Sequence, residues 1–315
     1  MTHSCLITGS TGLIGAALVR RFAADGLRVI AAARNVAKAR VLFEGLDNVE
    51  ILEWDVTRPL DAHTPSFDWM VHAAGETSSQ AFVERPAETI VTVVDGTRHA
   101  LDAARAAGAR AMVMLSTMEV YGAPTAERVT ERDYGYLDPL SVRSSYPEAK
   151  RLAETLCVAY QKEFGVPVRI ARLTQTFGEG VRYGDGRVFA EFARAILERR
   201  NIVLKTEGAT ARSYCYLGDA VEAIRVILER GEDGTAYTVA NESTFCTIRE
   251  MAEALVRAHP ESGSKVVLDT RGAAARGFAP SFRMNLDCAR LRALGWEPKV
   301  GLPEMFDRLM ASMSR

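Results

Sequence analysis

Tyr146 and Lys150 are residues whose types and spacing could move a proton. They lie four positions apart in the segment SSYPEAKRLAETL, so on a helix both side chains share one face, one turn from each other. The amino end of the helix and the lysine ammonium favour a phenolate, which predicts that the Tyr146 pKa lies below the usual value of about 10. Such a phenolate can take a hydroxyl proton as hydride leaves the same carbon. The alternative is an ordinary helical pair.

The start of this helix also has a signature. Ser145 and Glu148 have the spacing of a capping box, and Pro147 falls in the first turn, where its missing amide has no cost. Tyr146 is therefore expected at the helix entrance.

A second group of polar side chains lies in the segment LSTMEVYG. Ser116 and Thr117 follow a predicted buried strand at Ala111–Leu115. Because ligands bind at the carboxyl ends of parallel strands, these hydroxyls are expected to bond a substrate oxygen there.

Glycines with a regular spacing lie near the amino end of the chain. Gly9, Gly12 and Gly15 follow a predicted strand at Ser4–Thr8 and precede helical spacing at Ala16–Ala24. This arrangement predicts a tight turn whose backbone and helix amino end hold a pyrophosphate. The second strand reads VIAAARN, with Ala33 where an acid would bind the ribose of NAD, and with Arg34 and Lys38 after it.

Arg34 favours NADP, because a guanidinium matches a 2'-phosphate; a solvated loop arginine is the alternative. Other predicted cofactor contacts follow the next two strands. Asp55 and Val56 are expected near the adenine, and Ala73, Ala74 and Gly75 after His72 are expected beneath the cofactor. His72 has no partner at metal-ligand spacing, so no metal is predicted.

The elements that must position these residues alternate between strand and helix. Apolar runs at Arg28–Ala33, Val49–Trp54 and Trp69–Ala73 predict buried parallel strands, and therefore an α/β fold with a doubly wound parallel Rossmann sheet. The expected division is a dinucleotide-binding domain at residues 1–173 and a smaller α+β substrate lobe at 174–315, with one strand near 236–240 returning to the sheet.

Composition and charge exclude several classes of protein. The 39 basic and 40 acidic residues give a net charge of -1, without the positive field that nucleic-acid binding needs. No apolar run approaches the roughly 20 residues of a membrane span, and no signal peptide precedes the first strand, so a cytoplasmic location is expected. The five scattered cysteines indicate neither a zinc site nor a disulfide scaffold.

Together these motifs resemble the extended short-chain dehydrogenase/reductase family, in its nucleotide-sugar epimerase, dehydratase and decarboxylase branch. The landmarks are GSTGLIG, HAAG, STMEVYG, SYPEAK, TARSYCYLGDA and LGWEP, and they span nearly the whole chain. The resemblance implies that Thr117 is the hydroxyl group, Tyr146 the base and Lys150 the residue that orients the ribose and tunes the tyrosine. It implies an NAD(P) cofactor contacted also by Thr11, Leu13 and Ile14, and substrate contacts from Thr77, Ser116, Met118, Gln175, Arg187, Val188 and Arg212.

Several positions depart from the family pattern. Gln175 and Val93 replace asparagines, Phe177 replaces a tyrosine, and Met118 stands where family dehydratases have Asp and decarboxylases have Ser. Met118 can neither protonate a leaving hydroxyl nor bond a carboxylate. Glu119 could take a carbon-bound proton next to a 4-ketone, or serve as a structural carboxylate.

Three functions remain open from the sequence. The first is a nucleotide-sugar epimerase, dehydratase or decarboxylase that acts through a 4-keto intermediate and regenerates its cofactor. The second is a net NADPH-dependent reductase of a keto-sugar or other carbonyl, and the third is a dinucleotide sensor without catalysis. The resemblance also implies a homodimer joined through the helices near residues 87–107 and 146–164.

Overall fold

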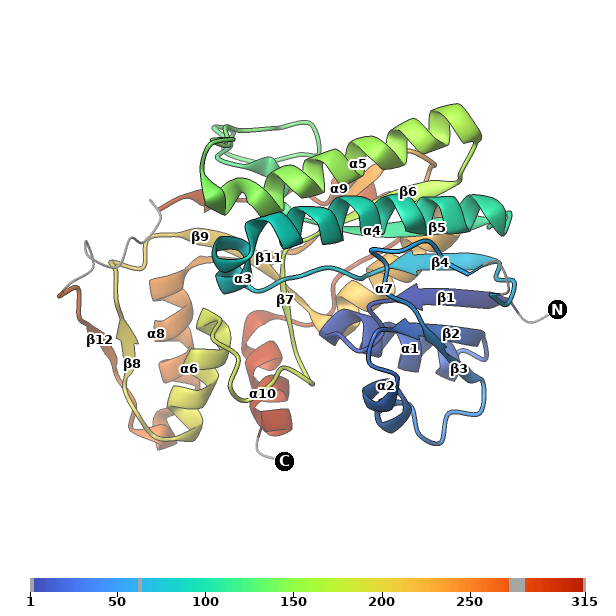
Figure 1. The fold of residues 1–315 in the computed structure, drawn as a ribbon. Helices are drawn as coiled ribbons and strands as arrows, with labels where there is room; N and C mark the ends of the chain where they lie inside the picture. The colour runs from blue at the N-terminus through green and yellow to red at the C-terminus, as the bar shows by residue number, and fades with distance from the viewer. Residues whose placement is uncertain (1–2, 62–63, 272–280, 314–315) are drawn as a thin grey trace.

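The larger part of the molecule is built on a seven-stranded parallel sheet (Figure 1). The computed structural model describes residues 3–61, 64–271 and 281–313. The strand order is β10-β6-β5-β4-β1-β2-β3. The strands are β1 (Ser4–Thr8), β2 (Arg28–Ala33), β3 (Val49–Glu53), β4 (Trp69–His72), β5 (Ala111–Thr117), β6 (Val168–Leu173) and β10 (Ala236–Val239). This confirms the predicted doubly wound sheet, with its switch point between β1 and β4.

Helices cover both faces of this sheet, which explains why its strands read as continuous apolar runs. The helices α3 (Ser79–Glu84), α4 (Pro86–Ala106) and α5 (Ser145–Phe164) lie on one face, and Figure 1 shows α4 and α5 side by side. The other face carries α1 (Leu13–Ala24), α2 (Val36–Leu42) and α7 (Leu217–Arg230). No helix within the described ranges has both the length and the apolarity to cross a bilayer.

A smaller lobe packs around its own aromatic core. Phe177 stacks on Phe189 with ring centroids 4.4 Å apart, and Phe306 closes the cluster at 5.2 Å. The strands here are β7 (Gln175–Phe177), β8 (Ile202–Leu204), β9 (Ala211–Tyr216), β11 (Asn241–Thr247), β12 (Val266–Leu268) and β13 (Arg283–Met284). Its helices are α6 (Val188–Leu197), α8 (Ile248–Ala258) and α10 (Leu302–Met313), and the 3-10 turn η3 (Pro260–Ser262) packs against α8. The short α9 (Ala289–Arg292) packs against β10 of the large sheet, and the 3-10 turns η1 (Met118–Tyr121) and η2 (Val142–Ser144) pack against α5.

The chain crosses between the two parts more than once. After α7 it returns to the large sheet, where β10 pairs in parallel with β6. It then enters β11, which pairs antiparallel with β9 of the smaller lobe. The substrate side of the molecule is therefore tied to the Rossmann sheet by continuous strands.

β5 is longer than the sequence pattern predicts. Its pairing with β6 continues through Ser116 opposite Arg172 and Thr117 opposite Leu173. The apolar run ends at Leu115, but ladder hydrogen bonds do not require apolar side chains. Ser116 and Thr117 are therefore strand residues, and their side chains point to opposite faces.

Candidate active site

The turn between β1 and α1 has the close backbone approach that a pyrophosphate requires. Gly9 has a φ of +63°, and a Cβ at this position would lie 2.7 Å from the Ala73 carbonyl. A Cβ at Gly15 would lie 2.2 Å from the Gly9 oxygen. Gly12 precedes α1 without a side-chain cap, so the first helix amides are available to an anion. Thr11 and Leu13 line the adjoining cavity, whereas Ile14 packs against the core.

Two cations follow β2 at the ribose end of this turn. Arg34 is exposed, and Lys38 Nζ donates to the Thr11 carbonyl at 2.8 Å. Asp55 follows β3 and accepts hydrogen bonds from the Thr57 amide and hydroxyl, at 3.0 and 2.9 Å. These bonds, aided by the charge of Arg34, lower the Asp55 pKa. Asp55 is thus ionised, while the adjacent Val56 is buried.

The segment after β4 runs beside the candidate catalytic lysine. Ala74 N–H donates to Thr8 Oγ1 at 3.1 Å, and the same hydroxyl lies 2.9 Å from His72 Nδ1. Burial, followed by the charge of Lys150, lowers the His72 pKa to about 3, so the ring is neutral near pH 7. A Cβ at Gly75 would lie 3.9 Å from Lys150 Nζ. Small residues here leave room beside the lysine for a flat ligand.

Thr117, Tyr146 and Lys150 come together where β5 meets the start of α5. The Thr117 hydroxyl lies close enough to the Tyr146 phenol to lower its pKa. Its ring stacks on Phe82, with centroids 4.2 Å apart. Lys150 Nζ donates to the Leu115 carbonyl at 2.7 Å and lies 6.0 Å from the Tyr146 ring centroid. A hydroxyl, a phenol and an ammonium therefore converge at the carboxyl edge of the sheet.

The predicted lowering of the Tyr146 pKa does not arise from the protein's own groups. Burial and then the Glu119 charge raise this pKa, while the Thr117 hydrogen bond and Arg143 oppose them. Burial also lowers the Lys150 pKa to about 8, and the charge of Glu154 acts against that change. Desolvation penalises any charged form, and at this buried position it outweighs the attraction of nearby cations.

The predicted capping box at the start of α5 is wrong. Ser145 is the first helical residue, and its hydroxyl donates to the Phe82 carbonyl at 3.0 Å. Glu148 instead approaches Arg151 at 3.4 Å, and Ser144 at the N-cap makes no side-chain capping bond. The helix begins one residue earlier than the motif implies, so the serine is not in the capping position. Its bond to Phe82 fixes the helix entrance next to Tyr146.

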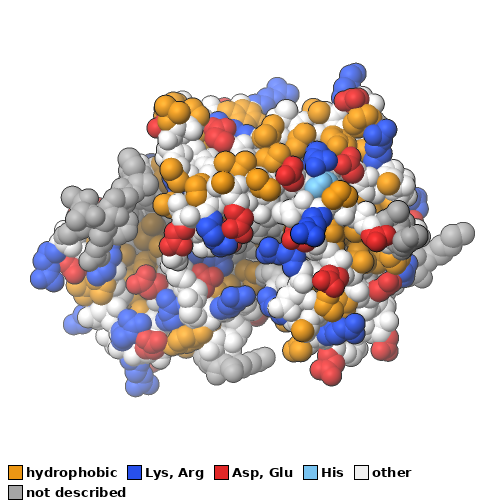
Figure 2. All heavy atoms as spheres, viewed as in Figure 1, with side chains coloured by type: hydrophobic (Ala, Val, Ile, Leu, Met, Phe, Trp, Pro, Cys, Tyr) orange, Lys and Arg blue, Asp and Glu red, His pale blue; other side chains and the backbone are white. Residues whose placement is uncertain are grey.

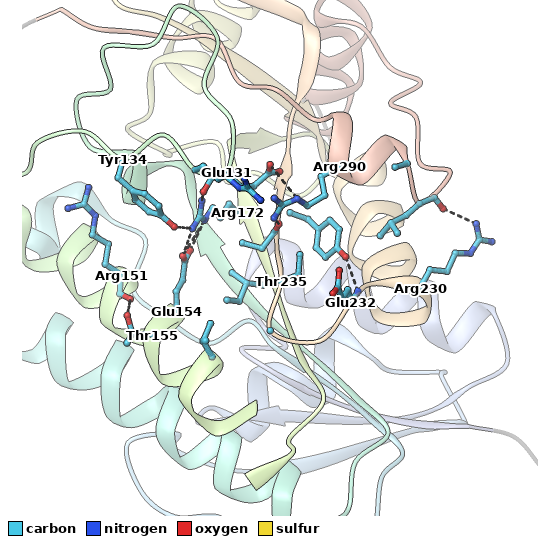
Figure 3. A pocket seen from close by; sticks show the side chains of 18 residues that line it. Glu131, Tyr134, Arg151, Glu154, Thr155, Arg172, Arg230, Glu232, Thr235 and Arg290 are labelled. Carbon is cyan, nitrogen blue, oxygen red and sulfur yellow. Dashed lines mark hydrogen bonds and ion pairs between the residues drawn. The ribbon is translucent and has the colours of Figure 1, made fainter. Parts of the chain in front are cut away.

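Ser116 turns away from the substrate side. Its hydroxyl donates to Glu154 Oε1 at 2.5 Å, and Glu154 Oε2 accepts from Arg172 Nη2 at 2.7 Å. Figure 3 shows Arg172 held between Glu154 and Tyr134 in a second cavity on this side. The prediction that Ser116 contacts the substrate is therefore corrected, because alternation along β5 gives that face to Thr117. Ser116 instead ties β5 to α5.

Glu119 lines the substrate cavity together with an arginine that the sequence reasoning did not single out. Arg143 Nη2 lies 3.0 Å from Glu119 Oε1 and 2.9 Å from Oε2. Met118 is 4% exposed, and its sulfur accepts a hydrogen bond from the Thr174 hydroxyl at 3.3 Å. Met118 thus forms part of the cavity wall, and Glu119 is paired.

A cavity of about 1970 Å³ separates the sheet edge from the smaller lobe. Figure 2 shows Lys and Arg side chains around the hollow in the middle of this face. Arg187 Nη2 binds Asp185 at 2.7 Å, whereas Arg212 stacks over Phe282 at 5.1 Å and has no carboxylate partner among the described residues. Arg212 is therefore available to an anion. The predicted substrate residues that line the cavity are Thr77, Met118, Gln175, Arg187, Val188 and Arg212.

Other cavity residues were missed from the sequence. Glu76 directly follows Gly75, and its carboxylate accepts from the Thr77 and Ser78 amides at 2.9 Å. Arg143 precedes Tyr146 by three residues, which is the one sequence signal that could have identified it. Tyr216 pairs with Glu179 at 2.8 Å across the floor, a contact that no local spacing reveals.

The fold and these residues define a Rossmann-type dinucleotide-binding protein with a threonine, tyrosine and lysine at its binding edge. The sequence model of the NAD dependent epimerase/dehydratase family matches residues 5–241. UDP-glucuronic acid decarboxylase 6 of Arabidopsis thaliana is 33% identical over 304 residues, covering 95% of this chain and 85% of the relative. UDP-glucuronic acid decarboxylase 1 of Danio rerio is 31% identical over 313 residues, covering 98% and 72%.

The chain therefore belongs to the NAD-dependent epimerase/dehydratase family, as the resemblance predicts, and is an enzyme that uses NAD. Solved structures share the fold. UDP-glucose 4-epimerase of Thermotoga maritima superposes with a TM-score of 0.82 at 21% identity, covering 99% of this chain and 98% of that one. The dTDP-glucose 4,6-dehydratase of Streptomyces venezuelae, solved with NAD, gives 0.80 at 24% identity, covering 99% and 97%.

Proposed function

We propose that the enzyme acts on a nucleoside diphosphate sugar through a 4-keto intermediate, and that its substrate is a nucleotide uronate that loses its carboxylate as CO2. The observation that carries the proposal is the Tyr146 phenol close to both Thr117 and Lys150, at the edge of a glycine turn that fits a dinucleotide. Support for decarboxylation comes from the relatives that are 33% and 31% identical, which are UDP-glucuronic acid decarboxylases.

The residues of the chain divide the proposed chemistry among them. Thr117 hydrogen-bonds the C4 oxygen of the sugar, and Tyr146, supported by Lys150, takes the C4 hydroxyl proton. The nicotinamide ring, when bound, supplies the hydride acceptor and, in its oxidised form, a positive charge that favours the phenolate. The resulting 4-ketone is β to the C6 carboxylate, so loss of CO2 leaves an electron pair delocalised onto the C4 oxygen. Addition of a solvent proton at C5 restores the 4-ketone. Return of the hydride to C4, with donation of the Tyr146 proton to the C4 oxygen, would then regenerate the cofactor and the phenolate, while Arg212 holds the diphosphate.

Mass analysis of the products tests this proposal. The protein is incubated with NAD and a panel containing UDP-glucuronate, UDP-glucose and dTDP-glucose. Loss of CO2 from the uronate is expected, with catalytic amounts of NAD sustaining many turnovers. The Tyr146→Phe variant should bind NAD normally and lose turnover. Steady consumption of added NADPH in proportion to product would instead identify a net reductase, and conversion by Tyr146→Phe at the wild-type rate would refute the role of the phenol.

We further propose that the cofactor site prefers NADP. Ala33 leaves no carboxylate to repel a 2'-phosphate, and Arg34 is exposed directly after β2. A charge-assisted hydrogen bond from this guanidinium contributes roughly 1.5 to 3 kcal/mol, or about tenfold to a hundredfold in affinity. Dissociation constants for NAD and NADP are compared in wild type, Arg34→Ala and the exposed control Arg40→Ala. Equal NADP affinity in all three proteins contradicts the proposal.

A homodimer through α4 and α5 completes the proposed assembly. The two helices lie side by side, and Figure 2 shows hydrophobic side chains over them. On these two helices, the side chains of Ile90, Val91, Leu152 and Val158 are between 43% and 49% exposed. Such a patch suits a protein interface. Light scattering is expected to give a dimer for wild type and for the control Leu140→Asp, and a monomer for Leu152→Asp. A monomeric wild type at micromolar concentration rules the proposal out.

A further inference from the structure

Arg143 lines the substrate cavity and forms an ion pair with Glu119, which lines the same cavity. It belongs to η2, three residues before Tyr146, and its guanidinium lies 5.1 Å from the centroid of the Phe82 ring on which Tyr146 stacks. Both oxygens of Glu119 lie within 3.0 Å of Arg143 Nη2. The Arg143 side chain is 43% exposed, so it remains accessible from the cavity. This ion pair joins η1 to η2 at the edge of the cavity.

Apart from Arg143, the charges around Tyr146 are unfavourable for a substrate carboxylate. The carboxylates of Glu119 and Glu76 both raise the Tyr146 pKa, whereas Arg143 acts in the opposite direction. Glu76 is itself fixed by the amides of Thr77 and Ser78. A substrate carboxylate placed near the phenol would therefore meet two negative charges. Arg143 is positioned to compensate them.

Three other cations of the site, Lys150, Arg187 and Arg212, are engaged by other groups or extend from a different element. Lys150 is buried and donates to the Leu115 carbonyl. Arg187 is neutralised by Asp185, and Arg212 extends from β9 on the smaller-lobe side. Arg143 is therefore the guanidinium that belongs to the same segment as Tyr146.

We propose that Arg143 binds the C6 carboxylate of the nucleotide uronate, and that the Glu119 carboxylate occupies this position until the substrate displaces it. The inference rests on the proposed function. In a uronate, C6 is two bonds from C4, so a C4 hydroxyl held by Thr117 and Tyr146 would bring the C6 carboxylate into the part of the cavity where the charges of Arg143 and Glu119 act on the phenol. Displacement releases Glu119 to the cavity, and departure of CO2 lets Arg143 return to Glu119.

This exchange predicts effects of opposite sign at the two partners. Arg143→Gln removes the donor, so affinity for a uronate should fall about tenfold, as for a lost charge-assisted hydrogen bond. Glu119→Gln removes the internal competitor, so uronate affinity should rise about two- to fivefold, the equivalent of an exposed ion pair. A merely structural Glu119–Arg143 pair would give losses at both positions. Affinity for a neutral hexose should change at neither position.

The experiment measures binding of UDP-glucuronate and UDP-glucose by calorimetry in a Tyr146→Phe background, which prevents turnover. Arg143→Gln and Glu119→Gln are compared with Arg28→Gln, a control whose side chain is 45% exposed, pairs with Glu50 at 2.7 Å and lies at the opposite end of the sheet. The opposite shifts, confined to UDP-glucuronate, support the inference. Equal changes for both sugars, or a loss at Glu119→Gln, overturn it and leave the proposed function standing. If neither nucleotide sugar binds to the background protein, the proposed function fails and the inference with it.

Discussion

Replacing Glu154 by glutamine removes the charge at the centre of a buried network behind the catalytic groups. Glu154 accepts from Ser116 on β5 at 2.5 Å and binds Arg172 on β6 through Nε and Nη2 at 3.0 and 2.7 Å. The Arg172 side chain is only 2% exposed. Glu154 also lies one helical turn after Lys150, whose protonated form it favours. The substitution thus acts on both stability and the candidate site.

The size of the effect follows from the burial of Arg172. Breaking a buried pair costs about 3 to 5 kcal/mol, because one charge is left without compensation. For a chain of this length that corresponds to a fall in Tm of about 5 to 8 °C. Without the Glu154 charge, the Lys150 pKa should fall further below about 8. Activity that needs the Lys150 ammonium should then be lost at a lower pH than in wild type.

Thermal melts and a pH–rate profile measure these two consequences. The matched control is Glu148→Gln on the same helix, because the Glu148 side chain is 39% exposed and its ion pair with Arg151 spans 3.4 Å. An exposed pair contributes about 0 to 1 kcal/mol, so the control should melt close to wild type. Equal falls in Tm for both variants would refute the argument from burial. An unchanged alkaline limb for Glu154→Gln would refute the electrostatic coupling to Lys150.

Further predictions concern the lysine, the glycine turn and the two hydroxyls. Burial lowers the Lys150 pKa from 10.5 to about 8, so between these two pH values the unfolded chain binds more protons than the folded chain. Urea melts should therefore show that the stability of the wild type rises with pH relative to that of Lys150→Met. A stability difference that stays constant with pH would contradict this. Gly15→Ala should destabilise by about 1 to 3 kcal/mol and weaken NAD binding, since its Cβ would lie 2.2 Å from the Gly9 oxygen. Steady-state kinetics should show a kcat near wild type for Ser116→Ala, which keeps the site face intact, and a large loss for Thr117→Ala; equal losses would refute the assignment of faces.

Much of the fold and part of the candidate site could be predicted because the responsible interactions are local. Apolar runs followed by glycine turns predict β1 and its neighbours, since a strand covered on both faces needs no polar alternation. The spacing of Gly9, Gly12 and Gly15 predicts the turn, because each glycine is required by close backbone contacts in the turn that a side chain would block. The four-residue interval from Tyr146 to Lys150 is likewise fixed by one helical turn.

The remaining features depend on contacts between segments that are distant in sequence. Ser116 meets Glu154 38 positions away, and Glu119 meets Arg143 24 positions away. The first pairing depends on β5 extending beyond the apolar run and packing against α5, and the second depends on how η1 and η2 pack against α5. In the protein without cofactor the Tyr146 pKa is raised and not lowered, because desolvation by the whole fold, which the sequence does not reveal, opposes the helix and lysine charges that it does reveal. The sequence by itself thus determined the Rossmann sheet, the glycine turn and the tyrosine–lysine pair. Tertiary structure decided which hydroxyl faces the cavity and which charges surround the phenol, because strand register and burial are properties of the assembled chain.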